Sequence, residues 1–302
     1  MLVSILINNY NYGSFLRQAI DSALSQTYPH IEVIVVDDGS TDDSRAIIAS
    51  YQANDQGRVQ SVLKENGGQA SAFNAGFAAS QGDIICFLDA DDLFLPEKVT
   101  EVVHTFKDHP EIGWCFHPLK RIDIETNTLL PNSEPEGASR ICDFRAQIPQ
   151  GKLPFSPPPT SGLCFKRSLL AQILPMPEVI RITSDNYLKL TALVLNQGYC
   201  LAQNLAIQRI HGNNAYTFRT DKQQLRAKIR ILTAYWMKQK FPALTGFTHR
   251  LLANGISTCW RLKDAEAREA IEQYLAKLSL AEKLEIQART LYYRLKFYGR
   301  KL

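Results

Sequence analysis

Short apolar runs alternate with helical patterns in the first hundred residues. Four runs rich in β-branched residues predict strands, at 2–8, 32–37, 59–64 and 84–89. The intervening segments predict helices, at about 15–24, 41–53 and 70–80. Strands that are apolar almost throughout and alternate with helices are typical of a mostly parallel sheet covered on both faces. We therefore expect an α/β fold.

The pattern changes in the second half of the chain. Gly113–Asp123 and Tyr199–His211 are expected as strands, and Ser184–Asn196 is expected as a helix. Beyond about Asp221, apolar positions keep a helical register through the rest of the sequence. This pattern predicts a helical C-terminal extension that follows the α/β part.

Composition and charge narrow the class of protein. Of the 302 residues, 45% are hydrophobic and 21% are charged, which excludes a disordered chain. A net charge of +4 is too small to indicate a nucleic-acid-binding protein, and we expect no nucleic-acid partner. The six cysteines form no C-x-x-C pair, which argues against a zinc ribbon or a thioredoxin-type site.

Several features bear on localisation. No apolar stretch approaches 18 residues, and Met1–Ile7 is expected as a strand rather than a signal peptide. Cysteines that are spaced singly fit a reducing compartment. We therefore expect a cytoplasmic protein, with peripheral contact at the inner face of the membrane as the open alternative.

Two of the predicted strands run into acidic segments. The second strand leads into Asp37–Asp42 (DDGSTD) and the fourth into Asp89–Asp92 (DADD). Parallel strands end at one edge of a sheet, where ligands of such folds bind, so the two clusters are expected to meet. For Asp42 and Asp43, which precede a predicted helix, capping of that helix is the favoured interpretation.

The spacing of Asp89 and Asp91 suggests a shared ligand. In extended backbone, residues i and i+2 point to the same side, so both carboxylates could face one ion. Oxygen ligands suit hard cations such as Mg²⁺ or Mn²⁺, but one pair of carboxylates is too few to hold such an ion alone. A diphosphate could complete the coordination. The pair therefore points to a substrate that arrives as a phosphate ester with its metal.

Several motifs follow one another in a fixed order. They are Val3–Asn8 leading to Tyr10-Asn11, Leu24–Tyr28 (LSQTY), Asp37–Asp42 (DDGSTD), Asn66–Gln69 (NGGQ), Asn74–Gly76 (NAG), and Gly82-Asp83 before Asp89–Asp92 (DADD). With these motifs the chain resembles a family 2 glycosyltransferase with the GT-A nucleotide-diphospho-sugar fold. The resemblance covers about residues 1–100 strongly and 160–215 weakly.

The resemblance implies a fold and a function. The fold would be a Rossmann-like mixed, mostly parallel sheet flanked by helices. Residues 1–100 would bind the nucleotide sugar, 101–220 would form the acceptor-binding subdomain of the same domain, and 221–302 would be the helical extension. The implied function is metal-dependent, inverting transfer from a nucleoside diphosphate sugar, with UDP favoured, to a sugar or lipid-linked acceptor. Assembly of a surface polysaccharide or glycolipid is the expected setting.

The resemblance also implies roles for single residues. Asn8 and Tyr10 would line the base pocket, with Tyr10 stacking on the base. Asp38 would accept a hydrogen bond from the base, and Asp89 would contact the ribose or the sugar. Asp91 would bind the Mn²⁺ or Mg²⁺ ion that bridges the two phosphates, which makes the nucleoside diphosphate a better leaving group.

The second half supplies candidates for the general base and a further metal ligand. Asp185 matches the position of the family's base, with Ser184 as a departure from the usual Glu-Asp pair. The alternative is that Ser184 caps a helix and Asp185 is an acid of its first turn. His211 matches a metal ligand that follows the last strand in relatives, while a structural histidine is the other interpretation. Ser161–Phe165 would lie beside the acceptor pocket, with Gly162 allowing close backbone approach, while an ordinary turn before a strand is the other interpretation.

The tail from 289 to 302 carries five basic residues and no acid. Its apolar and aromatic residues are Leu291, Tyr292, Leu295, Phe297 and Tyr298. A basic amphipathic helix of this kind can lie on an anionic membrane. It can equally pack its aromatic face on the rest of the protein, and both interpretations stay open.

Two rival functions are considered. A sugar nucleotidyltransferase would need a basic, Gly-rich loop for a triphosphate, and 8–14 has one Gly and neither Lys nor Arg. A non-catalytic nucleotide-sugar-binding module is suggested by Ser184 and by Phe73, which stands where many relatives have Arg. Asn8 stands where many relatives have Pro. These departures leave a basic residue near the donor either missing or supplied from elsewhere.

Overall fold

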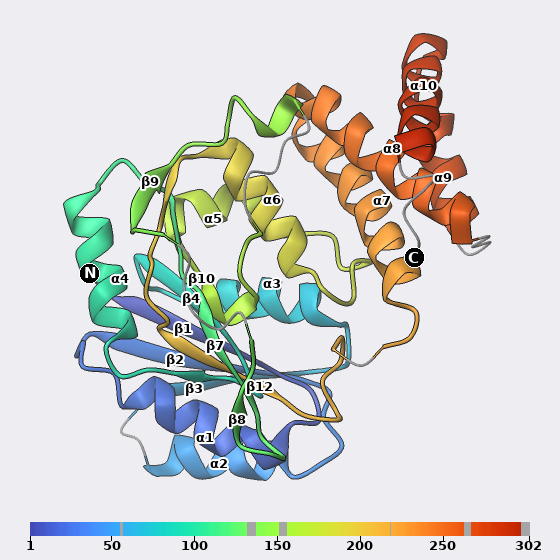
Figure 1. The fold of residues 1–302 in the computed structure, drawn as a ribbon. Helices are drawn as coiled ribbons and strands as arrows, with labels where there is room; N and C mark the ends of the chain where they lie inside the picture. Colours follow the sequence, from blue (N-terminus) through green and yellow to red (C-terminus); the bar gives the residue numbers. More distant parts are fainter. Residues whose placement is uncertain (55–56, 132–136, 151–155, 218, 263–266, 297–302) are drawn as a thin grey trace. The chain divides into compact units, whose positions relative to one another are not determined.

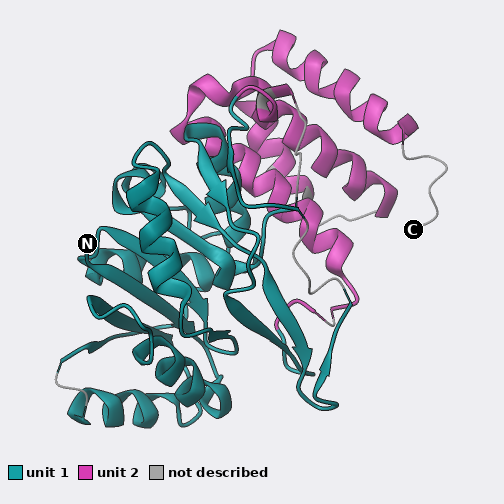
Figure 2. Cartoon of the chain, turned by 60° about the vertical axis from the view of Figure 1, so that its left-hand side comes forward, with its two compact units in different colours: residues 1–145, 155–214 teal, residues 146–154, 215–302 magenta. Residues whose placement is uncertain are grey.

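The computed structural model describes residues 1–54, 57–131, 137–150, 156–217, 219–262 and 267–296 (Figure 1). The chain divides into two compact units (Figure 2). Unit 1 comprises residues 1–145 and 155–214, and unit 2 comprises 146–154 and 215–302. Each unit has its own hydrophobic core, so each is described by itself.

Unit 1 begins with alternating strands and helices. They are β1 (Val3–Asn9), α1 (Gly13–Leu24), β2 (Ile31–Asp38), α2 (Ser44–Asn54), β3 (Val59–Lys64), α3 (Gln69–Ala79) and β4 (Ile84–Asp89). The four strands are parallel, in the order β3-β2-β1-β4. The predicted strands and the mostly parallel sheet are therefore confirmed, with helix α2 starting later than expected.

Both faces of this sheet are covered. Figure 1 shows α1 and α2 on one side of β1–β3 and α3 on the other. Ile5 and Ile7 point into the core shared with α1, where Leu16 is fully buried. Leu6 faces the other way, and a Cβ placed on Gly76 of α3 would lie only 3.5 Å from it. The alternation of β1 side chains thus explains why an apolar run without polar interruptions is buried on both faces.

The rest of unit 1 extends this sheet and adds a smaller one. The elements are β5 (Leu93–Phe94), α4 (Lys98–Asp108), β6 (Trp114–Phe116), β7 (Leu119–Asp123), β8 (Thr128–Leu129), β9 (Arg140–Cys142), η2 (Thr160–Gly162), β10 (Leu163–Lys166), α5 (Arg167–Ile173), α6 (Asp185–Leu195), β11 (Gly198–Cys200) and β12 (Ala206–Ile210). The large sheet continues as β4-β10-β6-β11-β9, and β10 runs antiparallel to its neighbours. The small sheet has the order β5-β12-β7-β8. The resulting mixed α/β architecture confirms the predicted fold class.

Two strand predictions are wrong in the same way. The run Gly113–Asp123 is two strands, β6 in the large sheet and β7 in the small one. The break falls at Pro118, which has no N–H to continue a ladder. Tyr199–His211 is likewise divided between β11 and β12. Strand β12 pairs with β5, with Ile207 opposite Leu93, and this pairing returns the chain to the acidic turn that follows β4.

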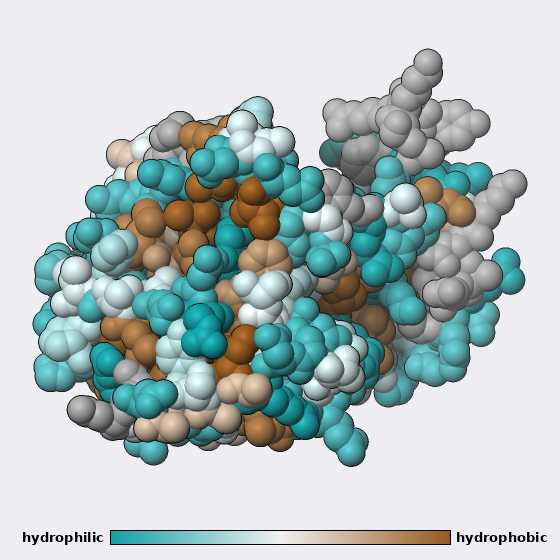
Figure 3. Space-filling model, turned by 90° about the horizontal axis from the view of Figure 1, so that it is seen from below, coloured by the Kyte–Doolittle hydropathy of each residue, from teal (hydrophilic) through white to brown (hydrophobic). Residues whose placement is uncertain are grey.

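The surface of the molecule is mixed in polarity. Seen from below, hydrophilic residues cover much of the surface and hydrophobic residues show between them in smaller groups (Figure 3). Such a mixture is ordinary for the water-exposed surface of a folded protein.

Unit 2 is helical, as predicted for the residues after Asp221. Its elements are η1 (Ile148–Gln150), α7 (Lys222–Lys240), η3 (Pro242–Leu244), α8 (Thr245–Leu262), α9 (Ala267–Ala276) and α10 (Leu280–Lys296). Helices α7 and α8 approach closely, because a Cβ on Gly255 would lie 2.7 Å from Ile231. Among the described residues, no helix combines the length and the apolar character needed to cross a membrane.

Candidate active site

The acidic turn after β4 is the centre of the candidate site. Asp89 ends the strand, and the backbone N–H of Asp92 donates to the carbonyl of Asp89 at 2.9 Å. The chain therefore turns here, and the expectation of extended backbone between Asp89 and Asp91 is wrong. Their carboxylates still interact. Burial, followed by the charges of Asp91 and Asp185, raises the pKa of Asp89 to about 8.

The side chain of Asp92 holds this turn in place through hydrogen bonds. Its carboxylate accepts hydrogen bonds from the Ser161 hydroxyl at 2.6 Å and from the backbone N–H of Arg209 in β12 at 3.1 Å. Burial and the neighbouring acids raise its pKa well above the ordinary value. The expected close approach at Gly162 is present, because a Cβ there would lie 2.4 Å from the carbonyl oxygen of His117. Ser161 is fully buried and therefore positions the acids rather than contacting solvent.

Asp91 and His211 lie together, as the sequence predicts for two metal ligands. The His211 Nε2 atom is 3.3 Å from Asp91 Oδ2, and both side chains are largely buried. The Asn214 amide donates to Asp91 Oδ2 at 2.9 Å and lies 3.0 Å from His211 Nε2. The imidazole stacks on Phe15 with ring centroids 4.3 Å apart, and Tyr12 meets it edge-on. Helix α1 thus holds the orientation of His211.

The separation of this pair fits one divalent cation. Two ligands at about 2.1 Å from one ion, on neighbouring octahedral positions, lie about 3 Å apart. Within the described ranges, no group of three or more His, Cys, Asp or Glu residues could hold a metal ion. The remaining ligands would have to be water or substrate oxygens. That arrangement suits Mg²⁺ or Mn²⁺ bound together with a diphosphate.

Asp185 begins α6 and is paired with a lysine one turn later. Its Oδ2 atom accepts from Lys189 Nζ at 2.6 Å, and both side chains are largely buried. Its Oδ1 atom has no hydrogen-bond partner among the described residues. Ser184 occupies the N-cap position, but its hydroxyl donates to the carbonyl of Ile180 instead of capping α6. The capping interpretation therefore fails for Ser184, and Asp185 lies close enough to Asp89 to raise its pKa.

Asn8 and Tyr10 lie at the carboxyl end of β1. Asn8 is opposite Asp89 in the β1–β4 register. Both polar atoms of its side-chain amide are buried without a partner among the residues that the structure describes. Tyr10 is 48% exposed, which leaves its ring available for stacking. An unpaired buried amide is costly unless a ligand supplies the hydrogen bonds.

Asp38 has a structural role that the sequence does not reveal. Its carboxylate accepts from Lys64 Nζ at 2.6 Å and from the backbone N–H groups of Gly67 and Gly68, at 2.9 and 2.7 Å. Gly68 has φ +85°, and a Cβ there would lie 2.8 Å from the backbone of Arg181. Asp38 therefore shapes the loop before α3, and a carboxylate retains room for one further donor.

Asp42 acts as a helix cap, as the favoured interpretation has it. Its carboxylate accepts from the backbone N–H of Gly13 at 2.8 Å and of Ser44 at 3.0 Å. Gly13 and Ser44 are the first residues of α1 and α2. One side chain therefore stabilises the starts of two neighbouring helices, and these hydrogen bonds lower its pKa against the opposing effect of burial.

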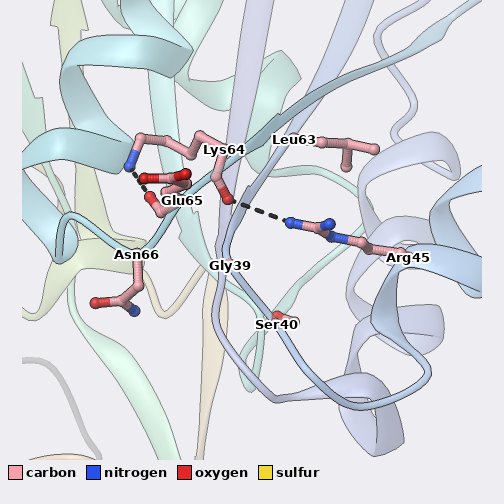
Figure 4. Close-up of a pocket in the computed structure, with 7 residues that line it drawn as sticks. All are labelled: Gly39, Ser40, Arg45, Leu63, Lys64, Glu65 and Asn66. Carbon is pink, nitrogen blue, oxygen red and sulfur yellow. Dashed lines mark hydrogen bonds between the residues drawn. The ribbon is translucent and has the colours of Figure 1, made fainter.

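A pocket of about 520 Å³ lies beside the loop that Asp38 organises (Figure 4). Its lining residues are Gly39, Ser40, Arg45, Leu63, Lys64, Glu65 and Asn66. Arg45 of α2 reaches across it to the carbonyl of Lys64 at 3.2 Å. The lining includes neither Asp89 nor Asp185, so this pocket is separate from the acidic centre of the candidate site.

Sequence analysis misses the basic residues of the site. Phe73 is a core residue packed on Phe87, with ring centroids 4.7 Å apart. The basic groups come from elsewhere: Lys189 pairs with Asp185, and the Arg181 guanidinium donates to the side-chain oxygen of Asn66 at 2.5 Å. The i, i+4 spacing of Asp185 and Lys189 on a predicted helix does indicate that the two side chains can pair. The positions of Arg181 and Asn214 depend on tertiary structure alone.

Comparisons with known proteins identify the family and the fold. The family described as Glycosyl transferase family 2 matches residues 4–171. An uncharacterized glycosyltransferase of Nostoc sp. is 38% identical over 215 residues, covering 71% of this chain and 66% of the relative. One from Rickettsia typhi is 30% identical over 259 residues, covering 84% and 78%.

Solved structures show the same fold. The structure of S. aureus TarS 1-349 in complex with UDP-GlcNAc superposes with a TM-score of 0.69 at 17% identity, covering 99% of this chain and 91% of that one. The mannosyltransferase PcManGT from Pyrobaculum calidifontis, in complex with GDP-Man and Mn²⁺, gives 0.55 at 18% identity, covering 99% and 88%. The order of motifs, the sheet and the family match lead to one conclusion: this chain is a glycosyltransferase and belongs to glycosyl transferase family 2.

Proposed function

We propose that the enzyme transfers a sugar, with inversion and with the help of Mn²⁺ or Mg²⁺, from a nucleoside diphosphate sugar to an acceptor hydroxyl. The observation that carries the proposal is the approach of Asp91 and His211 to 3.3 Å, although they are 120 residues apart in sequence. Their common partner Asn214 and the stacked Phe15 hold the pair in place. Two adjacent ligands with room for substrate oxygens are what a metal–diphosphate complex needs.

The donor side of the site belongs to residues 1–100. Asn8 offers an unpaired amide, Tyr10 offers an exposed ring, and Asp38 keeps a free acceptor position beside the loop of Gly67 and Gly68. In the proposal these groups hold the base, and Asp89 contacts the ribose or the sugar. A UDP-sugar is favoured, and the UDP-GlcNAc complex of TarS supports this choice.

Asp91 and His211 would hold the cation, which offsets the negative charge that develops on the leaving diphosphate. The Mn²⁺ and GDP-Man in the PcManGT complex support a divalent ion at this kind of fold. Asn214 would keep the Asp91 carboxylate turned toward His211, so that neither ligand has to reorganise when the donor binds.

The acceptor side belongs to residues 101–220. Inversion by one displacement needs a base on the face opposite the leaving group, and Asp185 is the proposed base. Lys189 occupies its Oδ2 atom, so Oδ1 is the oxygen that takes the proton of the acceptor hydroxyl. The acceptor would be a sugar or a lipid-linked sugar in surface polysaccharide or glycolipid assembly.

The helical extension, 221–302, is the proposed point of peripheral contact with the inner face of a membrane. On α10, Leu291, Tyr292 and Leu295 are more than half exposed rather than packed on the protein. Phe297 and Tyr298, which the sequence adds to this surface, lie outside the described residues. Exposed apolar side chains next to basic ones favour an anionic lipid surface as the partner.

The first prediction tests the cation site. Asp91→Ala should abolish Mn²⁺-dependent binding of UDP, because His211 alone cannot hold the ion. Isothermal titration with UDP, in Mn²⁺ and in EDTA, measures this effect. Asp43→Ala is the matched control, since Asp43 is exposed and outside the site. Equal Mn²⁺-dependent affinity in the wild type and Asp91→Ala would contradict the proposal.

A second measurement separates a transferase from a binding module. Transferases of this kind release some sugar to water, so slow Mn²⁺-dependent hydrolysis is expected with one member of a panel of UDP- and GDP-sugars. Binding of a nucleotide sugar without any turnover, with or without candidate acceptors, would retain the site and reject the catalytic role.

A further inference from the structure

Unit 2 contains a second pocket, of about 560 Å³, between α8 and α10. Its lining residues are Gln150, Arg250, Ala288, Arg289, Tyr292, Tyr293 and Lys296. All of them belong to unit 2, so the pocket does not depend on the other unit. Three of the seven are cationic, two are tyrosines and none is acidic.

The unpaired guanidinium of Arg250 is the main evidence for a ligand in this pocket. Its Nε and Nη1 atoms are buried and have no hydrogen-bond partner among the residues that the structure describes. A buried guanidinium without an acceptor carries an uncompensated desolvation cost. Proteins usually meet this cost with a carboxylate, and no carboxylate is among the residues that line the pocket.

Glu285, an acid of α10, is already paired with other residues. Glu285 Oε1 accepts from Arg289 Nε and Nη2, both at 2.7 Å, and its Oε2 atom lies 3.1 Å from His249 Nδ1. None of these bonds involves Arg250. The pocket thus holds more positive charge than the surrounding acids neutralise.

The amino-acid composition of unit 2 also shows an excess of positive charge. Residues 215–302 contain 18 Lys and Arg against 7 Asp and Glu, a net charge of +11. The chain as a whole has only +4. The excess of positive charge therefore lies in unit 2 and raises the local concentration of anions there.

We propose that this pocket binds a phosphate group, with Arg250 as its principal ligand and Arg289 and Lys296 as supporting charges. A guanidinium presents paired N–H donors that match two phosphate oxygens. Phosphate is favoured over a carboxylate because its greater charge suits three cations around one cavity. The two tyrosines add hydroxyl groups and ring surface to the lining of the pocket.

The phosphate can come from two sources, a free phosphate ion or the headgroup of an anionic lipid. Either one would use the same donors. A lipid would in addition place its chains beside the exposed Leu291 and Leu295 of α10. The experiment therefore compares inorganic phosphate with dihexanoyl phosphatidic acid, a soluble lipid that carries the same group.

Binding is measured by isothermal titration on the full-length protein, in EDTA so that metal-dependent binding in unit 1 is silent, and at constant ionic strength. Arg250→Gln should weaken the binding of both ligands by about tenfold or more, the loss typical of a charge-assisted hydrogen bond. Arg294→Gln is the matched control, because Arg294 is exposed on α10 outside the pocket and removes the same charge.

Thermal unfolding measured without phosphate shows whether weaker binding comes from a less stable variant. Arg250→Gln should unfold at the same temperature as the wild type or higher, because an unpaired buried charge is removed. A preference for the lipid over phosphate identifies a headgroup site, and equal affinities identify a free-phosphate site. The proposal is overturned if neither ligand binds. It is also overturned if each ligand binds the wild type, Arg250→Gln and Arg294→Gln with the same affinity.

Discussion

At the scale of single residues, the Asp185–Lys189 pair decides how the proposed base works. The ammonium group of Lys189 also donates to the carbonyl of Pro158 at 3.1 Å, so two acceptors hold it in place. An anchored partner fixes the orientation of the Asp185 carboxylate and directs Oδ1 away from the ion pair. A carboxylate held in this way can accept a proton without first reorienting.

The second prediction follows from this pair. Asp185→Asn keeps the size of the side chain and removes its basicity, so transfer should slow by about 10²–10⁴-fold, the usual contribution of a general base. The affinity for the donor should change little, because the donor contacts Asn8, Asp38 and Asp91. Initial rates with a saturating donor, and UDP titration in Mn²⁺, measure the two quantities.

Asp143→Asn is the control for this change, since Asp143 is an exposed acid paired with Arg145. Turnover near the wild-type level in Asp185→Asn would place the base elsewhere. Lys189→Gln should lower the rate less than Asp185→Asn, because the carboxylate stays while its anchor is lost.

At the scale of helices and strands, the sequence predicts what repeats along the chain. The run 84–89 matches β4 to the residue, because a strand buried on both faces is apolar almost throughout. The run 59–64 also matches β3, although it is mixed in polarity and only Val59 of it is buried. The run Gly113–Asp123 could not be divided correctly, since hydrophobicity does not say which sheet a residue joins. Only Pro118 marks the place where the chain leaves the large sheet.

The same limit applies to the site. Asp89, Asp91, Asp185 and His211 could be named because the motifs of a family carry them. Their partners could not, because Asn214 reaches Asp91 only through the pairing of β12 with β5. Contacts between distant segments are set by the arrangement of the sheets, which no local pattern reports.

Helix α10 carries the third prediction. Leu291 and Leu295 are 54% and 67% exposed, and their removal from water would contribute most of the apolar energy of a membrane contact. The double variant Leu291→Gln/Leu295→Gln should lower partitioning onto vesicles of phosphatidylglycerol and phosphatidylcholine by about tenfold or more. Sedimentation with vesicles at low salt measures the bound fraction.

The double variant Leu63→Gln/Leu129→Gln is the control, because both leucines are similarly exposed on unit 1. It should bind vesicles as the wild type does. If the intact protein does not sediment with anionic vesicles, the membrane contact is rejected and α10 has another role.

At the scale of the whole molecule, charge is divided unequally between the two units. Residues 1–214 contain 16 basic and 23 acidic residues, a net charge of −7, against +11 for 215–302. The acids of unit 1 include the proposed metal site, whereas the few acids of unit 2 are available to hold its own helices together. The stability of unit 2 should therefore depend strongly on individual carboxylates.

Glu282 is the clearest of these carboxylates. Ser279 and Glu282 form a capping box at the start of α10, with the Ser279 N–H donating to Glu282 Oε2 at 2.9 Å and the Glu282 N–H donating to Ser279 Oγ at 3.3 Å. Lys238 of α7 donates to the other carboxylate oxygen. The hydrogen bond from Lys238, followed by those from Ser279, lowers the pKa of Glu282 to about 2.

The last prediction is a pH dependence with a definite sign. The folded pKa of Glu282 lies below the ordinary value of 4.5, so its contribution to stability is complete above pH 4.5 and is lost as the pH falls toward about 2. Glu282→Gln should therefore increase hydrogen exchange in α10 at pH 7. The difference from the wild type should shrink steadily below pH 4.5, after correction for the intrinsic exchange rate. Glu272→Gln removes an exposed acid of the same unit and should show no such dependence. A difference that stays constant from pH 7 to pH 3 would mean that Glu282 stabilises α10 by packing rather than by its charge.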